Sequence, residues 1–552
     1  MLSDVEIAQA HTPEPIADIA RRAGVPDEAL IPYGSTKAKV DITKLDWSGK
    51  DGKLVLVTGV SPTPAGEGKS TTLIGLTDAL TQLGQRAVVA LREPSQGPVM
   101  GIKGGAAGGG YSQVVPMEDI NLHFTGDFHA IAAANNTLAA IVDNHLQQGN
   151  TLDIDPRRIT WQRCLDVNDR ALRGVVTGLG GKAHDVPRET GFTITAASEI
   201  MAILGLATSL EDLKARLGAI TVGYTYAGKP VTADDLNAAG ALTALMKDAL
   251  NPNLVQTLGG SPAFVHGGPF ANIAHGCNTL LATRTAMKLG DIVLTEAGFG
   301  SDLGAEKFFD VKARFGDLDV AGAVVVTTIR STKYNGGVAR ADLGTEDVDA
   351  LRAGVANLER HVENVRKFGV TPVVCVNLFT GDTEAEREFM RDWASDFGVA
   401  LAESEVWAKG GDGATELAEL LLDNFSEGTS KQLYSTEGGV RESIETIAME
   451  IYRADRVEYS VKALKDLADI ETNGWGDMPV CISKTQYSFS DDPAQLGAPT
   501  GHVLHVRELL PRTGAGFIVV LTGDVMTMPG LPKKPSSENI DVDANGKISG
   551  LF

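Results

Sequence analysis

A ten-residue stretch, TPAGEGKSTT at positions 63–72, constrains the fold of this chain more than any other feature. Its glycines and lysine are typical of a loop that wraps phosphates between a strand and a helix. The apolar run 54–57 before it predicts a buried parallel strand, and the helical spacing of apolar residues over 71–83 predicts the helix that follows. The residues expected at the phosphates are Thr63, Pro64, Ala65, Gly66, Glu67, Gly68, Lys69, Ser70 and Thr71.

The chemistry of such a loop depends on a few of its positions. Backbone N–H groups surround the phosphates, a lysine reaches the β and γ oxygens, and the following Ser or Thr coordinates Mg²⁺. Lys69 and Ser70 occupy those two positions. The common pattern GxxxxGK[ST] has a glycine where this chain has Thr63, but Gly66 and Gly68 keep the permissive backbone. We therefore predict a site for a nucleoside triphosphate such as ATP with Mg²⁺; the plainer alternative is a glycine-rich turn with a solvated lysine.

Length and composition exclude several classes of protein. At 552 residues the chain is too long for one ordinary core and suggests roughly three to four domains. The formal net charge of −22 argues against non-specific binding to nucleic acid or to an anionic membrane, because both need a basic surface. The four cysteines are widely spaced and predict reduced core thiols. Without a secretory h-region or an apolar run of about 18 residues, we expect a cytoplasmic protein.

Strand-like apolar runs, each bordered by helical patterns, recur along the chain at 87–91, 292–294, 323–326 and 373–376. This alternation predicts an α/β fold with a doubly wound, mostly parallel sheet of the P-loop NTPase type. A more charged region with two helical patterns and a hairpin-like stretch at 221–231 looks inserted. The predicted parts are a nucleotide-binding core over 1–135 and 246–450, an inserted α+β domain over 136–245 and a C-terminal α+β domain over 451–552.

Polar side chains follow the second predicted strand, which ends just before Arg92. The carboxyl ends of strands face the ligand crevice in open α/β sheets, so Arg92 should lie near the triphosphate. A guanidinium there suits a carboxylate substrate or a transferring phosphoryl group, although a structural ion pair is the alternative. The run 101–111 holds six glycines and predicts an irregular loop.

Two further groups of residues carry weaker signals. The loop 266–276 is rich in glycine and contains two histidines, which are as consistent with a structural as with a catalytic role. No HExxH or CxxC spacing supports a zinc or iron site. Phe379 and Trp407 follow predicted strand ends and could form a flat slot for a ring, but each alone is more commonly a core residue.

Taken together, these segments resemble the formate–tetrahydrofolate ligase family, also called formyltetrahydrofolate synthetase, over nearly all 552 residues. The family's phosphate loop also begins with threonine. The motifs that carry the resemblance are TPAGEGKSTT, REPSQGPVMGIKGGAAGGGYSQVVPMEDINLHFTGDFHA, IDPRRITW, TAASEIMAIL, LVQTLGG, FVHGGPFANIAHG, TEAGFGSDLGAEKF, TQYSFSDDP and GFIVVLTGDVMTMPGLP.

The resemblance implies ATP-dependent ligation of formate to tetrahydrofolate through formyl phosphate, giving 10-formyltetrahydrofolate, ADP and phosphate. Lys69 and Mg²⁺ at Ser70 would then stabilise the transferring phosphoryl group, and Arg92 would hold formate and formyl phosphate. Phe379 and Trp407 would stack on the two faces of the pterin ring. The resemblance also implies a homotetramer activated by a monovalent cation such as K⁺ or NH₄⁺, with Glu93 a candidate for organising the cation's loop.

The chain departs from the expected family pattern at two places. Residues Lys333-Tyr334-Asn335 stand where a Lys-Met-His run is more usual, and Leu378 stands where a lysine is common. The first departure removes any histidine near position 335, and the second alters the edge of the expected folate slot. Two rival functions share the phosphate loop: an ATPase switch that changes partners, and a ligase that activates another carboxylic acid. The switch proteins carry a second lysine early in the loop, where this chain has Pro64.

Overall fold

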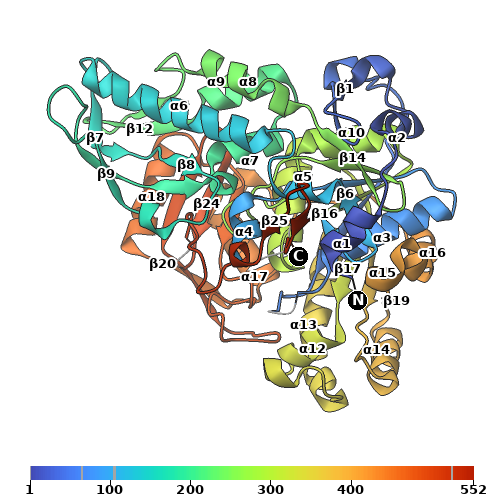
Figure 1. Ribbon diagram of the computed structural model, residues 1–552. Helices are drawn as coiled ribbons and strands as arrows, with labels where there is room; N and C mark the ends of the chain where they lie inside the picture. Colours follow the sequence, from blue (N-terminus) through green and yellow to red (C-terminus); the bar gives the residue numbers. More distant parts are fainter. Residues whose placement is uncertain (1, 64–65, 103–106, 524–525, 552) are drawn as a thin grey trace.

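The computed structural model describes residues 2–63, 66–102, 107–523 and 526–551 and centres on a 12-stranded sheet (Figure 1). The strand order is β1-β2-β14-β15-β4-β16-β3-β17-β18-β19, and the β5–β6 pair joins the sheet at β14. Every neighbouring pair from β15 across to β19 is parallel, whereas β1, β2, β6 and β14 pair antiparallel at the other side. The predicted α/β class with a mostly parallel sheet is therefore confirmed.

The predicted strand runs all form strands of this sheet, and some are longer than predicted. The predicted runs correspond to β3, β4, β16, β17 and β18, whereas the other strands of the sheet were not predicted. The bounds of all its strands are β1 (Leu30–Pro32), β2 (Ala38–Val40), β3 (Lys53–Gly59), β4 (Ala87–Leu91), β5 (Gly108–Gly109), β6 (Ser112–Val115), β14 (Asn253–Thr257), β15 (Pro262–Val265), β16 (Ile292–Glu296), β17 (Val320–Thr327), β18 (Pro372–Asn377) and β19 (Ala400–Ser404).

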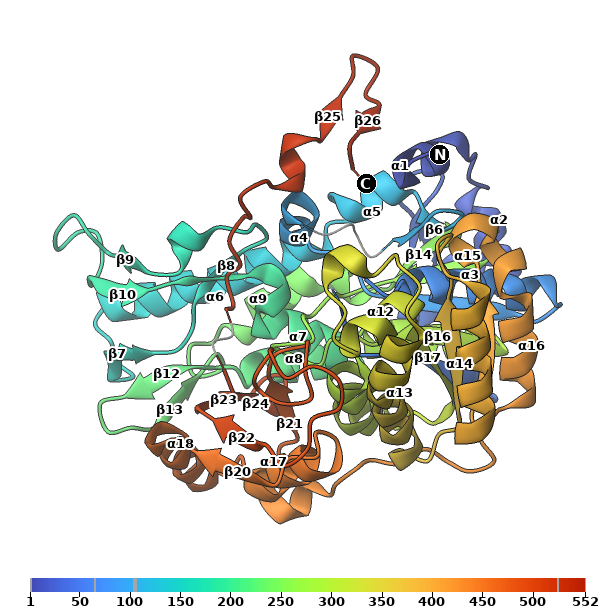
Figure 2. The same ribbon diagram turned by 90° about the horizontal axis from the view of Figure 1, so that it is seen from below.

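Both faces of the sheet are covered by helices (Figure 2). Side chains alternate along β3, so Leu54 and Leu56 join one hydrophobic cluster while Val55 and Val57 join the other. The first cluster includes residues of α10 and α13, and the second includes residues of α3 and α16. These helices are α3 (Lys69–Gln82), α10 (Leu280–Leu289), α13 (Val348–Lys367) and α16 (Thr415–Asp423). Burial on both faces explains why β3 and β4 are continuous apolar runs.

The region between α6 and β14 packs beside the central sheet as small sheets and helices. The predicted hairpin is present as β12 and β13, which pair with β7. Three helices follow α6 here rather than two helical patterns. The elements are α6 (Asp127–Gln147), β7 (Ile154–Ile159), β8 (Arg163–Leu165), β9 (Val175–Thr177), β10 (Arg188–Thr190), β11 (Phe192–Ile194), α7 (Glu199–Leu206), α8 (Leu210–Gly218), β12 (Thr221–Thr225), β13 (Pro230–Thr232) and α9 (Ala239–Met246). The predicted boundaries at 135 and 245 fall inside α6 and α9, and the division into domains stays a prediction.

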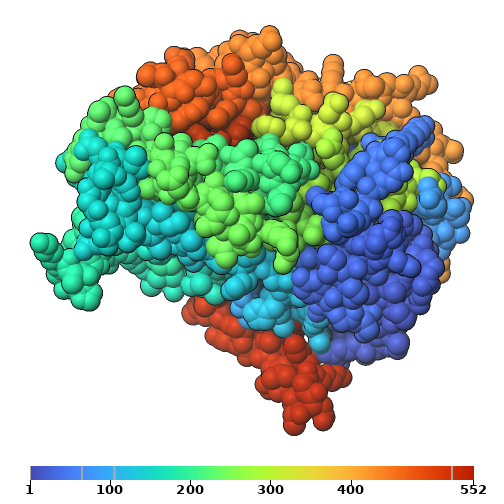
Figure 3. Space-filling model, turned by 90° about the horizontal axis from the view of Figure 1, so that it is seen from above, coloured from blue at the N-terminus to red at the C-terminus, as the bar shows by residue number. Residues whose placement is uncertain are grey.

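The C-terminal region forms two more small sheets against α17 and α18. Beyond β24 the chain runs back to the first helix, where Gln9 Nε2 donates to the Ile548 carbonyl at 2.7 Å and Leu551 is fully buried. Figure 3 shows this last segment beside the N-terminal residues. The elements are α17 (Gly439–Glu450), β20 (Arg456–Tyr459), α18 (Val461–Thr472), β21 (Val480–Ser483), β22 (Val503–Val506), β23 (Glu508–Arg512), β24 (Phe517–Leu521), β25 (Asp541–Val542) and β26 (Ile548–Ser549).

Two local expectations need correction. The helix after the phosphate loop begins at Lys69 and not at residue 71, because the left-handed Gly68 directly precedes its first turn. The glycine-rich run is not wholly irregular: α4 (Gln96–Gly101) ends in it and Gly108–Gly109 pair with β6, whereas residues 103–106 lie outside the described residues. Within the described residues, no helix is both long and apolar enough to cross a membrane.

Candidate active site

Three neighbouring parallel strands end together at one edge of the sheet, and each contributes a polar group there. β16 lies between β3 and β4 and pairs with both. The phosphate loop follows β3, Arg92 follows β4, and Glu296 is the last residue of β16. Because the carboxyl ends of parallel strands share an edge, residues more than 200 positions apart meet at this point.

Glu296 links the other groups. Ser70 Oγ donates to Glu296 Oε2 at 2.7 Å, and Arg92 Nε donates to Glu296 Oε1 at 3.3 Å. The Glu296 side chain is 1% exposed, whereas that of Arg92 is 23% exposed. Burial lowers the pKa of Lys69, and the nearby carboxylates of Glu67 and Glu296 oppose that effect. The site therefore combines the cationic groups of Lys69 and Arg92 with the buried carboxylate of Glu296, which accepts from Ser70 and Arg92.

The phosphate loop is held by Asn377, at the end of β18, and by a hydrogen bond within the loop. Gly68 has a φ of 74°, and a Cβ there would lie 2.4 Å from Nδ2 of Asn377, so a side chain would not fit. Asn377 ends β18 and donates from Nδ2 to the carbonyl of Glu67 at 3.1 Å. Thr63 donates its N–H to Glu67 Oε1 at 2.7 Å. Thr63, Glu67 and the Asn377 amide thus fix both sides of the loop.

The N–H groups at the start of α3 follow directly and suit an anion. Lys69, Ser70 and Thr71 form its first turn, and Gly66 is exposed. The predicted phosphate contacts Pro64 and Ala65 lie outside the described residues.

Sequence reasoning missed Glu296. The available signal was an apolar run, IVLT, that ends in an acidic residue, which is the pattern of the strand that carries the Mg²⁺-associated acid in P-loop enzymes. That signal is weak alone, because many strands end in a carboxylate. Only the placement of β16 between β3 and β4 brings this residue to Ser70 and Arg92.

Phe379 and Trp407 come from adjacent strand ends. Asn377 of β18 is in register with Ser404 of β19, and the aromatic residues follow two and three positions later. Both side chains are half-buried. Phe379 donates its N–H to Asp382 Oδ2 at 2.8 Å, and the guanidinium of Arg330 lies 4.5 Å from its ring centroid.

Trp407 does not directly end a strand but lies in the short helix α15 (Val406–Lys409). Its carbonyl accepts from Tyr111 N–H at 2.9 Å, and a Cβ on Gly110 would lie 2.8 Å from Cδ2 of its indole. The glycine-rich loop therefore packs directly against this tryptophan. The structure brings both aromatic residues to the edge that carries the phosphate loop, and one face of the Phe379 ring is covered by Arg330.

Glu93 is buried behind Arg92, with 5% of its surface exposed. Burial raises the pKa of Glu93 well above its usual value; Asp127 and Asp166 add to the rise, and Lys39 opposes it. Its Oε2 is buried and has no hydrogen-bond partner among the described residues. A buried carboxylate in this state either holds a proton or needs a cation.

The two segments that contain the departures from the expected family pattern have structural contacts. Lys333, in α12 (Ile329–Asn335), is buried and pairs with Glu386 Oε1 at 2.7 Å. Asn335 accepts from Gly497 N–H at 3.2 Å, which joins α12 to the C-terminal region. Leu378 is half-buried and packs against the larger hydrophobic cluster.

The histidine loop and the cysteines have structural surroundings. His266 is fully buried and bonds with Thr279 Oγ1 and the Ala249 carbonyl, each at 2.7 Å, while His275 is buried against Gly205. The cysteines are buried and free, in agreement with the prediction: Cys164, Cys277, Cys375 and Cys481.

Comparison with known proteins identifies the family of this chain. The family model described as formate–tetrahydrofolate ligase matches residues 2–552. A formate–tetrahydrofolate ligase from Corynebacterium diphtheriae is 69% identical over 552 residues, with all of both chains covered. Those from Corynebacterium jeikeium and Staphylococcus carnosus are 66% and 58% identical; all of this chain is covered, with 98% and 100% of those proteins respectively. The chain therefore belongs to the formate–tetrahydrofolate ligase family.

Proposed function

We propose that this protein is the ligase that joins formate to tetrahydrofolate at the expense of ATP, giving 10-formyltetrahydrofolate, ADP and phosphate. The observation that carries the proposal is the meeting of Ser70, Arg92 and Glu296 at one sheet edge, beside Lys69. This arrangement offers positive charge for a triphosphate and a second cationic group for a small carboxylate, in a chain of this family. It also supports a P-loop NTPase type of fold for the core.

The reaction proceeds in two balanced steps. A formate oxygen attacks the γ-phosphorus of ATP, the bond to the β–γ bridging oxygen breaks, and ADP leaves. The product, formyl phosphate, is a mixed anhydride and a far better electrophile than formate. The N10 amine of tetrahydrofolate then attacks the formyl carbon, phosphate leaves with the C–O bond electrons, and N10 loses a proton.

Each cationic group has a separate task. Lys69 would reach the β and γ oxygens of bound ATP and stabilise the charge that develops on them. The contact of Arg92 with Glu296 is long and uses only Nε, which leaves its terminal nitrogens for formate and then formyl phosphate. The oxygens of Ser70 and Glu296 are hard donors 2.7 Å apart and fit Mg²⁺, which would neutralise phosphate charge when bound.

Phe379 and Trp407 are proposed to bind the pterin ring between them. Neighbouring strands lie about 4.7–4.9 Å apart, so residues two or three positions beyond paired strand ends can face each other across one ring. Arg330 covers one face of Phe379, which leaves the other face for stacking. Glu93, whose buried Oε2 lacks a partner, is proposed for a monovalent cation such as K⁺ or NH₄⁺. A homotetramer and a cytoplasmic location complete the proposal.

The decisive experiment is an assay of 10-formyltetrahydrofolate formation with ATP, formate and tetrahydrofolate, in which each substrate is left out in turn. Product should form only when all three are present. Hydrolysis of ATP at an equal rate without formate and tetrahydrofolate would favour an ATPase switch. Turnover with a larger carboxylic acid in place of formate, and not with formate, would favour another acid-activating ligase.

A further inference from the structure

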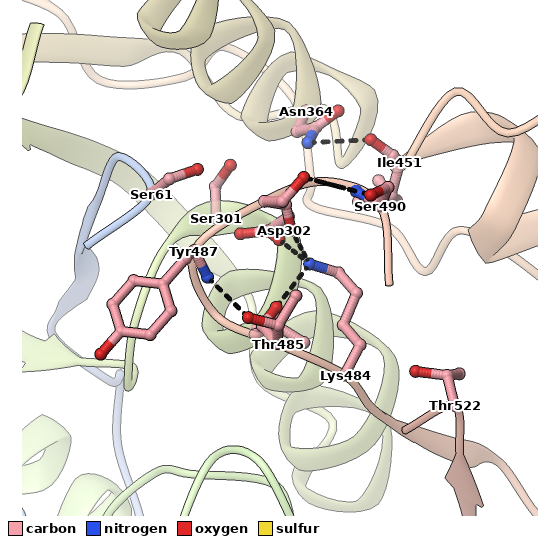
Figure 4. A network of polar contacts seen from close by, with 12 residues as sticks. Ser61, Ser301, Asp302, Asn364, Ile451, Lys484, Thr485, Tyr487, Ser490 and Thr522 are labelled. Carbon is pink, nitrogen blue, oxygen red and sulfur yellow. Dashed lines mark hydrogen bonds and ion pairs between the residues drawn. The ribbon is translucent and has the colours of Figure 1, made fainter. Parts of the chain in front are cut away.

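One buried histidine, His361, contacts both the segment that leads into the phosphate loop and the segment that follows Glu296. His361 lies on α13 and is fully buried. Its Nε2 is 3.1 Å from the hydroxyl of Ser61, which lies between β3 and the phosphate loop. Its Nδ1 is 2.8 Å from the hydroxyl of Ser301, five residues after Glu296. Figure 4 shows the two serines close together, with Asp302 and Lys484 on the far side of Ser301.

The hydrogen-bond partners determine one arrangement of protons. Burial lowers the pKa of His361 to about 4, so the ring is neutral near pH 7. Ser301 Oγ donates to the His361 carbonyl at 3.2 Å and accepts from Nδ1–H. Asn357 Nδ2 donates to Ser61 Oγ at 3.1 Å, so the Ser61 hydroxyl donates to Nε2. Every donor in this chain of four side chains then has an acceptor.

The segment after Glu296 is tightly confined by these contacts. A Cβ on Gly300 would lie 2.8 Å from Cε1 of His361 and 3.0 Å from the Val60 carbonyl, so α13 and the residue after β3 leave no space there. On the other side, Asp302 Oδ2 pairs with Lys484 Nζ at 2.7 Å, and both side chains are fully buried. The loop that follows Glu296 is therefore fixed between β3, α13 and the C-terminal region.

We propose that His361 is a positioning residue for the ligation reaction: through Ser61 and Ser301 it holds the phosphate loop and the segment after Glu296 at a fixed separation. That separation sets how Ser70 and Glu296 face each other, and hence how Mg·ATP is held. The inference rests on the proposed function of these two residues. His361 itself touches neither substrate. A misplacement of about 1 Å by a distant mutation can cost on the order of a hundredfold in rate.

Three substitutions at His361 test its hydrogen bonds to Ser61 and Ser301 separately. His361→Asn can replace the Nδ1 donor to Ser301 but cannot reach Ser61, and His361→Gln can replace the Nε2 acceptor for Ser61 but not the Nδ1 link. His361→Phe keeps the volume and loses both. We expect His361→Phe to lower kcat by roughly ten- to a hundredfold and to raise the Mg²⁺ concentration for half-maximal activity about tenfold, as outer-shell changes do. The KM for tetrahydrofolate should stay within about twofold.

The matched control is His275→Phe. His275 is also fully buried, but neither ring nitrogen has a hydrogen-bond partner among the described residues, and the ring lies against Gly205 and 6.4 Å from the centroid of Phe517. This variant should keep the parental Mg²⁺ dependence even if it melts earlier. Ser61→Ala removes one hydroxyl without a volume increase and keeps the proposal testable if His361→Phe does not fold.

The outcomes are distinct. An unchanged Mg²⁺ requirement in folded His361→Phe, or in Ser61→Ala if that variant must stand in, overturns the positioning role and leaves a packing role. The same shift in His275→Phe also overturns it. If the parental protein makes no 10-formyltetrahydrofolate, the proposed function fails first, before any variant is compared.

Discussion

The phosphate end and the ring end of the proposed site are built differently, although both lie at the same edge of the sheet. At the phosphate end, Ser70 and Arg92 already contact Glu296, and the loop is fixed by Asn377. At the ring end, Phe379 and Trp407 are half-buried and belong to separate segments. The guanidinium of Arg330 contacts the Phe379 ring, and the glycine-rich loop packs against Trp407.

This difference indicates which interactions contribute most of the binding energy at each end of the site. Buried, paired charges lose much when one partner is removed, because the remaining charge is left unpaired in a site that water reaches poorly. Half-buried aromatic walls contribute stacking and area, which change in smaller steps. The phosphate end should therefore control the rate of the reaction, and the ring end should control the affinity for the folate. The following substitutions test this division.

Replacement of Lys69 by alanine should have the largest effect. A lysine in the first turn of α3 supplies charge to the phosphates and little core packing, so ligation should fall a hundredfold or more while the melting temperature stays near that of the parent. Initial rates with saturating substrates and a thermal melt are the two measurements. Half of the parental activity in a folded variant would contradict the phosphate-loop assignment.

Arg92→Ala should lower formate-dependent turnover on the order of a hundredfold and spare ATP binding, because the guanidinium is assigned to formyl phosphate and not to the nucleotide. Calorimetry of Mg·ATP binding gives the control. Arg86→Ala is a matched surface substitution, since Arg86 pairs with Asp291 in solvent and should change neither quantity. Equal loss of ATP affinity in Arg92→Ala would move Arg92 into the nucleotide site.

Glu296→Gln should reduce kcat by roughly ten- to a hundredfold and raise the Mg²⁺ concentration for half-maximal activity, because the amide keeps the shape but loses the charge that faces Ser70 and Arg92. An activity titration over Mg²⁺ concentration measures both effects. A variant with the parental Mg²⁺ curve would show that Glu296 is only a structural partner of Arg92.

Trp407→Ala tests the ring end and should act mainly on KM. Loss of one stacking face costs about 0.5–1.5 kcal/mol beyond area burial, so the KM for tetrahydrofolate should rise roughly two- to tenfold. A partial reaction without folate, such as ATP formation from ADP and carbamoyl phosphate, should stay near normal. A packing role for Trp407 predicts instead a lower melting temperature and an equal loss in the partial reaction.

Arg330→Met should have the smallest effect. A partly exposed cation–π contact contributes about 0.5–1 kcal/mol, so loss of the guanidinium from the Phe379 ring should change the KM for tetrahydrofolate by only about two- to fivefold. The rate of the folate-independent reaction is the control. A loss comparable to that of Lys69→Ala would break the division between the two ends, because Arg330 would then act in the chemistry.

The sequence was sufficient for the elements whose signal is local. Continuous apolar runs marked β3, β4 and β18 because these strands are buried on both faces, and the loop motif marked Lys69 and Ser70. The sequence did not predict the segments in which charged side chains are buried. Residues 301–313 form a largely π-helical segment that is wholly buried although it carries Asp302 and Lys312. Their partners are Lys484 and Asn278, which come from distant segments, and no local sequence pattern predicts such pairs.

The site shows the same limit. Arg92 could be placed at the crevice because the end of β4 is readable from its own residues. Glu296 could not, because its role depends on the position of β16 in the sheet order and on two partners elsewhere in the chain. His361 gives no signal at all, since a histidine within a helix is ordinary until Ser61 and Ser301 are seen beside it.

The position of β16 also limits when the centre of the sheet can fold during synthesis. β3 and β4 leave the ribosome well before β16, yet they do not pair with each other, because the place between them belongs to that later strand: 204 residues separate Arg92 from Glu296. Until then the nascent chain carries two apolar strands whose shared partner does not exist, and unpaired strands of this kind promote association between chains. The centre of the sheet and the proposed ATP site therefore cannot be complete before β16 is synthesised, and a chain halted before that point has neither.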